Sequence, residues 1–120
     1  MVPSSTGAVV VIPFPFSDLS QTKLRPAVVL AAAGRGDWIL CQVTSRPYAD
    51  ATAVMLEQGD FKTGGLQTVS YARPGKRFTA SESLFSGEAG CLGPDRFERL
   101  HEAVAAILRA GRTSSSRARS

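Results

Sequence analysis

The sequence predicts one small, mainly β domain, in which about five to seven short strands form a strongly twisted barrel closed by a C-terminal helix. Three observations predict it. Most of the chain consists of short, β-branched apolar segments separated by Gly, Pro and polar residues. The last apolar stretch instead repeats at helical spacing. A chain of 120 residues, 43% of them hydrophobic, is long enough for one core and no second one.

Three apolar segments near the N-terminus predict an antiparallel meander. Ala8–Phe16 (AVVVIPFPF) suits a strand, and its two prolines predict that its far end is an edge or a bulge. Ser17–Leu24 is polar and predicts an exposed loop. Pro26–Ala32 and Trp38–Ser45 are the expected second and third strands, joined by a tight turn at residues 34–37.

Shorter segments complete the expected barrel. Ala53–Leu56 predicts a fourth strand. Leu66–Ala72 and Lys76–Ala80 predict two more, with Arg73-Pro74-Gly75 as a turn between them. Ser81–Phe85 predicts a single helical turn.

The C-terminal element is predicted to be an amphipathic helix. It starts at Pro94, and Arg109 and Gly111 are typical of a helix end. Its apolar residues recur at helical spacing: Phe97, Leu100, Val104, Ile107 and Leu108. Residues 111–120 contain no apolar residue larger than alanine, which predicts a disordered basic tail after a domain of residues 1–110.

The net charge of +4 comes from the C-terminus. Without the four arginines of the last twelve residues, bases and acids balance at ten each. A basic tail attracts nucleic acid or an acidic partner, or is only a solvated chain end. The rest of the chain is therefore neutral, and its net charge does not indicate a class of partner.

Cysteine and histidine usage excludes several classes. Cys41 and Cys91 are too few for a disulfide scaffold, and their spacing fits no zinc motif, so we expect reduced core thiols. His101 lies beside the apolar stripe of the helix, and we expect it to face solvent. We therefore expect no metal and no cofactor. The start lacks a basic signal-peptide region and no apolar run is long enough to span a membrane, so a cytoplasmic location is expected.

Polar residues at the ends of the apolar strands are the candidates for a functional site. Arg25 directly precedes the second strand, and Gln42, Thr44 and Ser45 end the third. In a meander the first strand ends where the second begins. We expect the third strand to end there only if it bends or crosses over, which leaves the convergence of Arg25 and Thr44 open.

The order of these motifs resembles the PemK/MazF-type toxins of type II toxin–antitoxin systems. The matching segments are GAVVVIPFPFSDLSQTKLRPAVVLAA, WILCQVTSRP and SYARPGKRFTASESL, and the likeness spans roughly residues 7–109. The family usually opens with Gly-Asp, where this chain has Gly7-Ala8. An acid that some relatives carry in the first loop is matched only approximately, by Asp18.

The resemblance implies a small SH3-like barrel and a metal-independent endoribonuclease. In that chemistry the 2′-OH of single-stranded RNA attacks the adjacent phosphate and leaves a 2′,3′-cyclic phosphate and a 5′-OH. The family's catalytic arginine and threonine match Arg25 and Thr44 position for position. The resemblance also implies a homodimer and a cognate antitoxin.

Further residues are candidate RNA contacts, each with a plainer alternative. Arg73 either holds the RNA backbone or supports a loop, and phenylalanines of the first strand are more often core than stacking platforms. Charged loop residues are usually only solvated. The candidate RNA-binding set is Ser45, Gln42, Phe16, Asp18, Lys23, Arg73 and Lys76.

Two other classes of function share this barrel. A CcdB-type toxin binds DNA gyrase and cleaves nothing, and an inactive relative would only bind its antitoxin. The presence of both Arg25 and Thr44 favours the nuclease over both alternatives.

Overall fold

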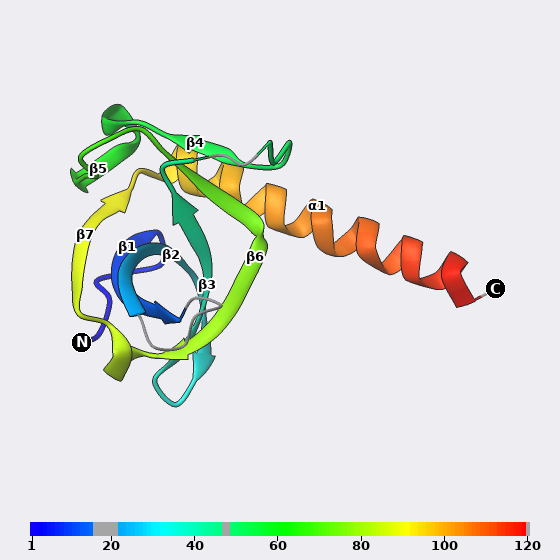
Figure 1. Ribbon diagram of the computed structural model, residues 1–120, viewed down its shortest axis with the longest axis horizontal. Coiled ribbons are helices and arrows are strands. Elements are labelled where there is room, and N and C mark those ends of the chain that lie inside the picture. The colour runs from blue at the N-terminus through cyan, green and yellow to red at the C-terminus, as the bar shows by residue number, and fades with distance from the viewer. Residues whose placement is uncertain (16–21, 47–48, 120) are drawn as a thin grey trace.

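The computed structural model describes residues 1–15, 22–46 and 49–119, and it shows one curled, seven-stranded sheet with a C-terminal helix (Figure 1). The strand order is β4-β6-β3-β2-β1-β7-β5. The mainly β fold predicted from the sequence is confirmed. Figure 1 shows the sheet curling around most of a circle, with the helix leaving from one side.

The predicted meander is confirmed in β1 (Ala8–Pro15), β2 (Thr22–Gly34) and β3 (Asp37–Thr44), which pair antiparallel in sequence order. The turn between β2 and β3 uses positive φ angles at Gly34, Arg35 and Gly36, which two glycines adopt without strain. The far end of β1 pairs only with β2, so it is the edge that its prolines predicted.

The second strand begins earlier than predicted. The expected loop reached Leu24, whereas β2 already starts at Thr22 and pairs Lys23 with Phe14 and Leu24 with Pro13. Polar side chains are compatible with a strand whose neighbour supplies the backbone hydrogen bonds. Arg25 therefore lies within a paired strand rather than before it.

The predicted turn at Arg73-Pro74-Gly75 is wrong. These residues belong to one continuous strand, β6 (Ser70–Ser81), which pairs with β3 on both sides of an irregularity. Gln42 is opposite Arg73 and its neighbour Cys41 is opposite Arg77, so three residues of β6 bulge out. A bulge accommodates proline because no ladder hydrogen bond is required there.

The remaining strands close the ends of the sheet. β4 (Val54–Leu56) pairs with β6 as an edge, and β7 (Gly87–Leu92) pairs with β1. β5 (Phe61–Gly64) pairs with β7, and the sequence predicted neither of these two strands. A Cβ at Gly64 would lie 2.2 Å from the Ala89 carbonyl oxygen, so glycine lets these backbones approach. Short 3₁₀ turns lie at Gln58–Asp60 (η1) and, as predicted, at Glu82–Leu84 (η2).

An apolar cluster lies on each face of the sheet. One apolar cluster packs against the helix, and we call it the helix-side cluster: Val9, Val28, Leu30, Cys41, Val43, Val54, Leu56, Ala72, Leu92 and Leu100. The other we call the pocket-side cluster: Ala8, Val10, Ile12, Ala27, Val29, Leu40 and Phe85, with Phe14, Trp38, Phe78 and Ala80 against it. Adjacent buried residues of β1, β2 and β3 alternate between the two clusters.

Both cysteines are buried free thiols, as predicted. Burial raises the pKa of the Cys41 thiol to about 12. His101 is exposed, its ring centroid 5.8 Å from that of Phe97, as expected for a solvent-facing histidine on the helix.

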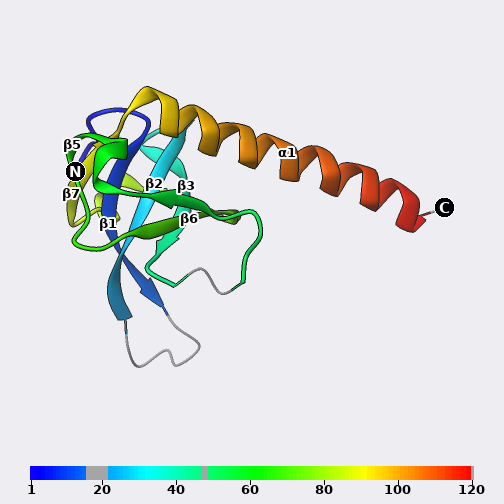
Figure 2. The ribbon, with the colours of Figure 1, turned by 90° about the horizontal axis from the view of Figure 1, so that it is seen from above.

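Helix α1 (Pro94–Arg119) begins at the predicted proline but does not end at Gly111. A glycine costs a helix only about 1 kcal/mol relative to alanine, so Gly111 alone does not have to end it. Figure 2 shows the C-terminal half of α1 projecting away from the sheet. The tail boundary at residue 110 stays a prediction. No helix in the described part of the chain has the length and hydropathy needed to cross a membrane.

Candidate functional site

Arg25 lies in β2 with its side chain on the pocket-side face. Its register partner in β1 is Ile12, and directly paired residues of an antiparallel sheet share a face. The residue is half-buried. Because β2 is paired with β1 at this residue, the backbone that carries the guanidinium is held in place.

Thr44 is the last residue of β3 and is half-buried. Its Oγ1 accepts a hydrogen bond from the backbone N–H of Arg46 at 3.1 Å, which ends the strand in a tight turn. The oxygen keeps its own proton to donate elsewhere. Ser45 follows directly and is exposed.

The strand register brings Arg25 and Thr44 to the same end of the sheet. The register of β2 with β3 ends at the pair Ala27–Gln42, and Arg25 and Thr44 each lie two residues beyond that pair. Adjacent antiparallel strands run in opposite directions, so β2 begins where β3 ends without any bend. The expectation that convergence would require bending or crossing is therefore wrong.

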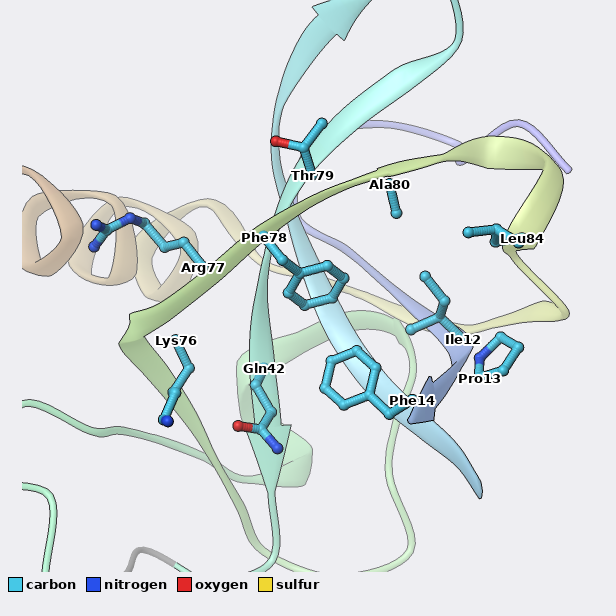
Figure 3. Close-up of a pocket in the computed structure, with 10 residues that line it drawn as sticks. All are labelled: Ile12, Pro13, Phe14, Gln42, Lys76, Arg77, Phe78, Thr79, Ala80 and Leu84. Carbon is cyan, nitrogen blue, oxygen red and sulfur yellow. The ribbon is translucent and has the colours of Figure 1, made fainter. Parts of the chain in front are cut away.

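Gln42 lies on the same face, between Ala27 of β2 and Arg73 of β6. It lines a pocket of about 420 Å³ beside the Arg25–Thr44 end of the sheet (Figure 3). The walls are largely apolar, and Phe14 and Phe78 meet there edge to face with their ring centroids 4.8 Å apart. The pocket is lined by Ile12, Pro13, Phe14, Gln42, Lys76, Arg77, Phe78, Thr79, Ala80 and Leu84.

The β6 bulge places Lys76 at the rim of this pocket. The Arg77 Nη1 donates a hydrogen bond to the Pro74 carbonyl oxygen at 2.9 Å, which holds the bulge closed. Figure 3 shows the Arg77 guanidinium directed away from the pocket toward α1, while the Lys76 side chain extends beside Gln42. Arg77 thus acts on the backbone, and Lys76 is left to face solvent at the pocket mouth.

Arg73 anchors the segment after β3. Its Nε donates to Asp50 Oδ2 at 3.0 Å, and Thr52 donates to Asp50 Oδ1 through both its hydroxyl and its backbone N–H. These hydrogen bonds, those of Thr52 first and then that of Arg73, hold the pKa of Asp50 below its usual value. The structure therefore gives Arg73 a supporting role through a carboxylate.

Other predicted contacts are less closely grouped. Lys23 is exposed on β2, opposite Phe14. Phe16 and Asp18 lie outside the described residues. No group of three or more His, Cys, Asp or Glu residues able to hold a metal ion occurs among the residues described.

Sequence reasoning missed Phe78 and Asp50 as parts of this region. Phe78 reaches the pocket through its pairing with Leu40, and its alternation within Lys76–Ala80 was the only available signal. Asp50 is an isolated acid in a polar segment, and nothing in the sequence links it to a residue 23 positions away.

Comparison with known proteins decides the family. Residues 5–108 match the family described as PemK-like, MazF-like toxin of type II toxin-antitoxin system. The chain belongs to this family. The resemblance noted in the sequence is thereby confirmed, over nearly the whole described body. The chain matches no curated protein sequence.

Solved structures of similar fold include MazF proteins. The MazE-MazF complex from Deinococcus radiodurans is 20% identical, with a TM-score of 0.71 over 90% of this chain and 96% of that one. An endoribonuclease in complex with its cognate antitoxin from a mycobacterial species is 16% identical, with a TM-score of 0.66 over 90% and 95%. Mycobacterium tuberculosis toxin MazF-mt6 is 15% identical, with a TM-score of 0.63 over 83% and 96%. At these identities the likeness establishes the fold.

Proposed function

We propose that this PemK/MazF-family chain is a metal-independent endoribonuclease toxin that cleaves single-stranded RNA. The observation that carries the proposal is the antiparallel pairing of β2 with β3, which brings the start of β2 and the end of β3 to the same end of the sheet. Arg25 and Thr44 belong to those two strand ends, and we propose that a fixed positive charge and a hydroxyl donor act there on one phosphate, beside the pocket. Proteins of the same fold are named endoribonucleases, which supports the same reaction here.

The reaction uses the nucleophile that RNA already contains. The 2′-oxygen attacks the adjacent phosphorus and gives up its proton, while the bond to the 5′-oxygen breaks and that oxygen gains a proton. The products are a 2′,3′-cyclic phosphate and a 5′-OH. Negative charge grows on the non-bridging oxygens, so preorganised donors there lower the barrier.

Arg25 is the residue suited to that charge. Its planar fork donates to two phosphate oxygens at once, which an ammonium group cannot do. Thr44 supplies a neutral donor from the adjacent strand, and Ser45 a second hydroxyl. With the guanidinium neutralising the phosphorane, the reaction needs no divalent cation.

The RNA strand is proposed to follow the same end of the sheet. Gln42 and Lys76 contact it at the pocket, and Lys23 extends the cationic surface along β2. Arg73 is proposed to contact the RNA backbone from its position beside Asp50. Phe16 and Asp18 complete the proposed set from the segment outside the described residues.

We also propose that a cognate antitoxin neutralises the chain and that it acts as a cytoplasmic homodimer. The support is the family and the solved complexes of similar chains with antitoxins. An antitoxin segment lying across the RNA path would block cleavage by occupying it. Co-expression with the neighbouring gene product should relieve growth arrest caused by this chain.

The decisive experiment uses matched oligonucleotides. An RNA cut by the purified protein is compared with the same sequence carrying one 2′-deoxy sugar at the cleavage position, both in excess EDTA. We expect the RNA to be cut, with 5′-OH ends, and the deoxy substrate to remain intact because it lacks the nucleophile. Cutting of the deoxy substrate, or loss of activity in EDTA that Mg²⁺ restores, would contradict the mechanism.

A further inference from the structure

The pocket beside Arg25 has the composition of a binding site for one flat, partly polar group. Its walls are apolar and aromatic, and its volume of about 420 Å³ is in the range of small-ligand pockets. The edge-to-face pair of Phe14 and Phe78 forms one wall (Figure 3). Single-stranded RNA presents such groups, because its unstacked bases insert between aromatic side chains.

Two polar groups at this pocket have no partner among the residues that the structure describes. Neither the Gln42 amide nor the Lys76 ammonium makes a hydrogen bond or ion pair within the described ranges of the chain. Both line the pocket, and Figure 3 shows the two side chains extending side by side at its mouth. They are therefore available to a ligand whose edge reaches the mouth.

The chemistry of these two groups selects the ligand. An amide offers one donor and one acceptor and can pair with the edge of any base. An ammonium group only donates, so it favours a carbonyl oxygen over an amino group. Uracil and guanine carry a carbonyl where cytosine and adenine carry an amino group.

The pocket is next to the proposed scissile phosphate. Ile12, which lines the pocket, is the direct register partner of Arg25, and such partners have their Cβ atoms about 5 Å apart. A base in the pocket would therefore belong to a nucleotide adjacent to the cut. We propose that this pocket holds a uracil or guanine next to the cleaved bond and that Gln42 and Lys76 set this preference; the proposal rests on the function proposed above.

The experiment measures which base is preferred next to the cleaved bond, rather than the rate of cleavage. Wild type, Gln42→Glu and Lys76→Ala are incubated with a random-sequence RNA, and the 5′-OH ends are sequenced. Lys62→Ala is the matched control, since Lys62 is equally exposed but lies on β5. Wild type and Lys62→Ala should favour uracil or guanine at one position adjacent to the cut.

The pocket variants should change that one position. In Gln42→Glu the amide donor is replaced by a carboxylate that only accepts, so preference should shift about tenfold toward cytosine or adenine. Lys76→Ala should weaken the uracil and guanine preference without reversing it. If both variants cut RNA with the wild-type base frequencies, the pocket does not read the base and the proposal is wrong.

A second measurement separates this proposal from the proposed function. Ring-proton NMR signals of Phe14 and Phe78 in wild type are followed during titration with each nucleoside monophosphate. Shifts with UMP and GMP that exceed those with CMP and AMP support the pocket even if no RNA is cut, in which case only the nuclease function fails. RNA cleavage with no ring shift for any nucleotide, or ring shifts with an antitoxin peptide alone, overturns the pocket and leaves the nuclease intact.

Discussion

The two faces of the sheet differ in how completely they are covered. On the helix-side face, Cys41 and Val43 of β3 are buried beneath Leu100 and its neighbours on α1. On the pocket-side face of the same strand, Leu40 is buried but Gln42 and Thr44 are only half-buried. One strand thus contributes core side chains to one face and polar side chains to the uncovered end of the other.

This difference separates stability from activity. Substitutions on the helix-side face should unfold the protein while leaving the chemistry of the folded fraction unchanged. Substitutions at the open end of the pocket-side face should reduce RNA cleavage while leaving the fold unchanged. The predictions below test this separation, from the largest expected effect to the smallest.

Leu100→Ala should produce the largest loss of stability. Leu100 is fully buried, and truncation of such a leucine costs about 2–5 kcal/mol of unfolding free energy because it leaves a cavity. Leu108→Ala, on the same helix but at a residue 54% exposed, should cost less than about 1 kcal/mol. Urea unfolding of both variants measures the contrast. Equal losses would mean that α1 does not pack as described.

Arg25→Ala should produce the largest loss of activity. Removing a preorganised donor from a developing oxyanion costs about a hundred- to a thousandfold in rate. Arg25→Lys should recover little of it, because a point charge does not bridge two oxygens. The control is Arg99→Ala, which removes the same charge from an exposed site on α1. Single-turnover cleavage is measured with melting temperature beside it. A folded Arg25→Ala protein with wild-type rate would refute the assignment.

Thr44→Ala should reduce cleavage less, by about tenfold, because a neutral donor is weaker than a charged one. Thr44→Ser keeps the hydroxyl and the bond from the Arg46 N–H, so it should remain near wild type. Thr63→Ala, an exposed threonine on β5, serves as control. If the serine variant were as slow as the alanine variant, the methyl group rather than the hydroxyl would be responsible.

Asp50→Asn should lower the melting temperature in a pH-dependent manner. The pKa of Asp50 is lowered in the folded state, chiefly by the hydrogen bonds from Thr52 and then by Arg73, so its ionised form stabilises the fold. That stabilisation is present above the unfolded carboxyl pKa of about 3.9 and is lost as the pH falls through the lower folded value. The difference in melting temperature between wild type and variant should be present near pH 7 and disappear as the pH falls through the lowered folded-state pKa of Asp50.

Truncation after Ala110 should have the smallest effect on stability. The projecting end of α1 lies away from the sheet, so we expect the melting temperature to remain within about 2 °C of wild type. Loss of Arg112, Arg117 and Arg119 should weaken RNA binding at low salt and reduce its salt dependence. A drop of several degrees would show that this segment packs on the body.

The elements that local pattern defines were predicted well. β1, β3 and the start of α1 follow from β-branched runs, turn residues and helical spacing, all of which are read within a few neighbouring residues. β5, β7 and the continuity of β6 were missed. All three depend on pairing with distant strands, and the Arg73-Pro74-Gly75 segment has the residues of a turn although β3 holds it in a bulge.

The candidate site divides in the same way. The sequence by itself determined which residue types are present at the strand ends, and through the family resemblance it selected Arg25 and Thr44. Only the tertiary structure decided that these residues lie at the same end of the sheet, that Phe78 and Lys76 meet Gln42 at one pocket, and that Arg73 pairs with Asp50. The reason is physical: alternation and capping act between neighbours along the chain, whereas register and bulges depend on which strands pair, and a one-residue change of register exchanges the two faces.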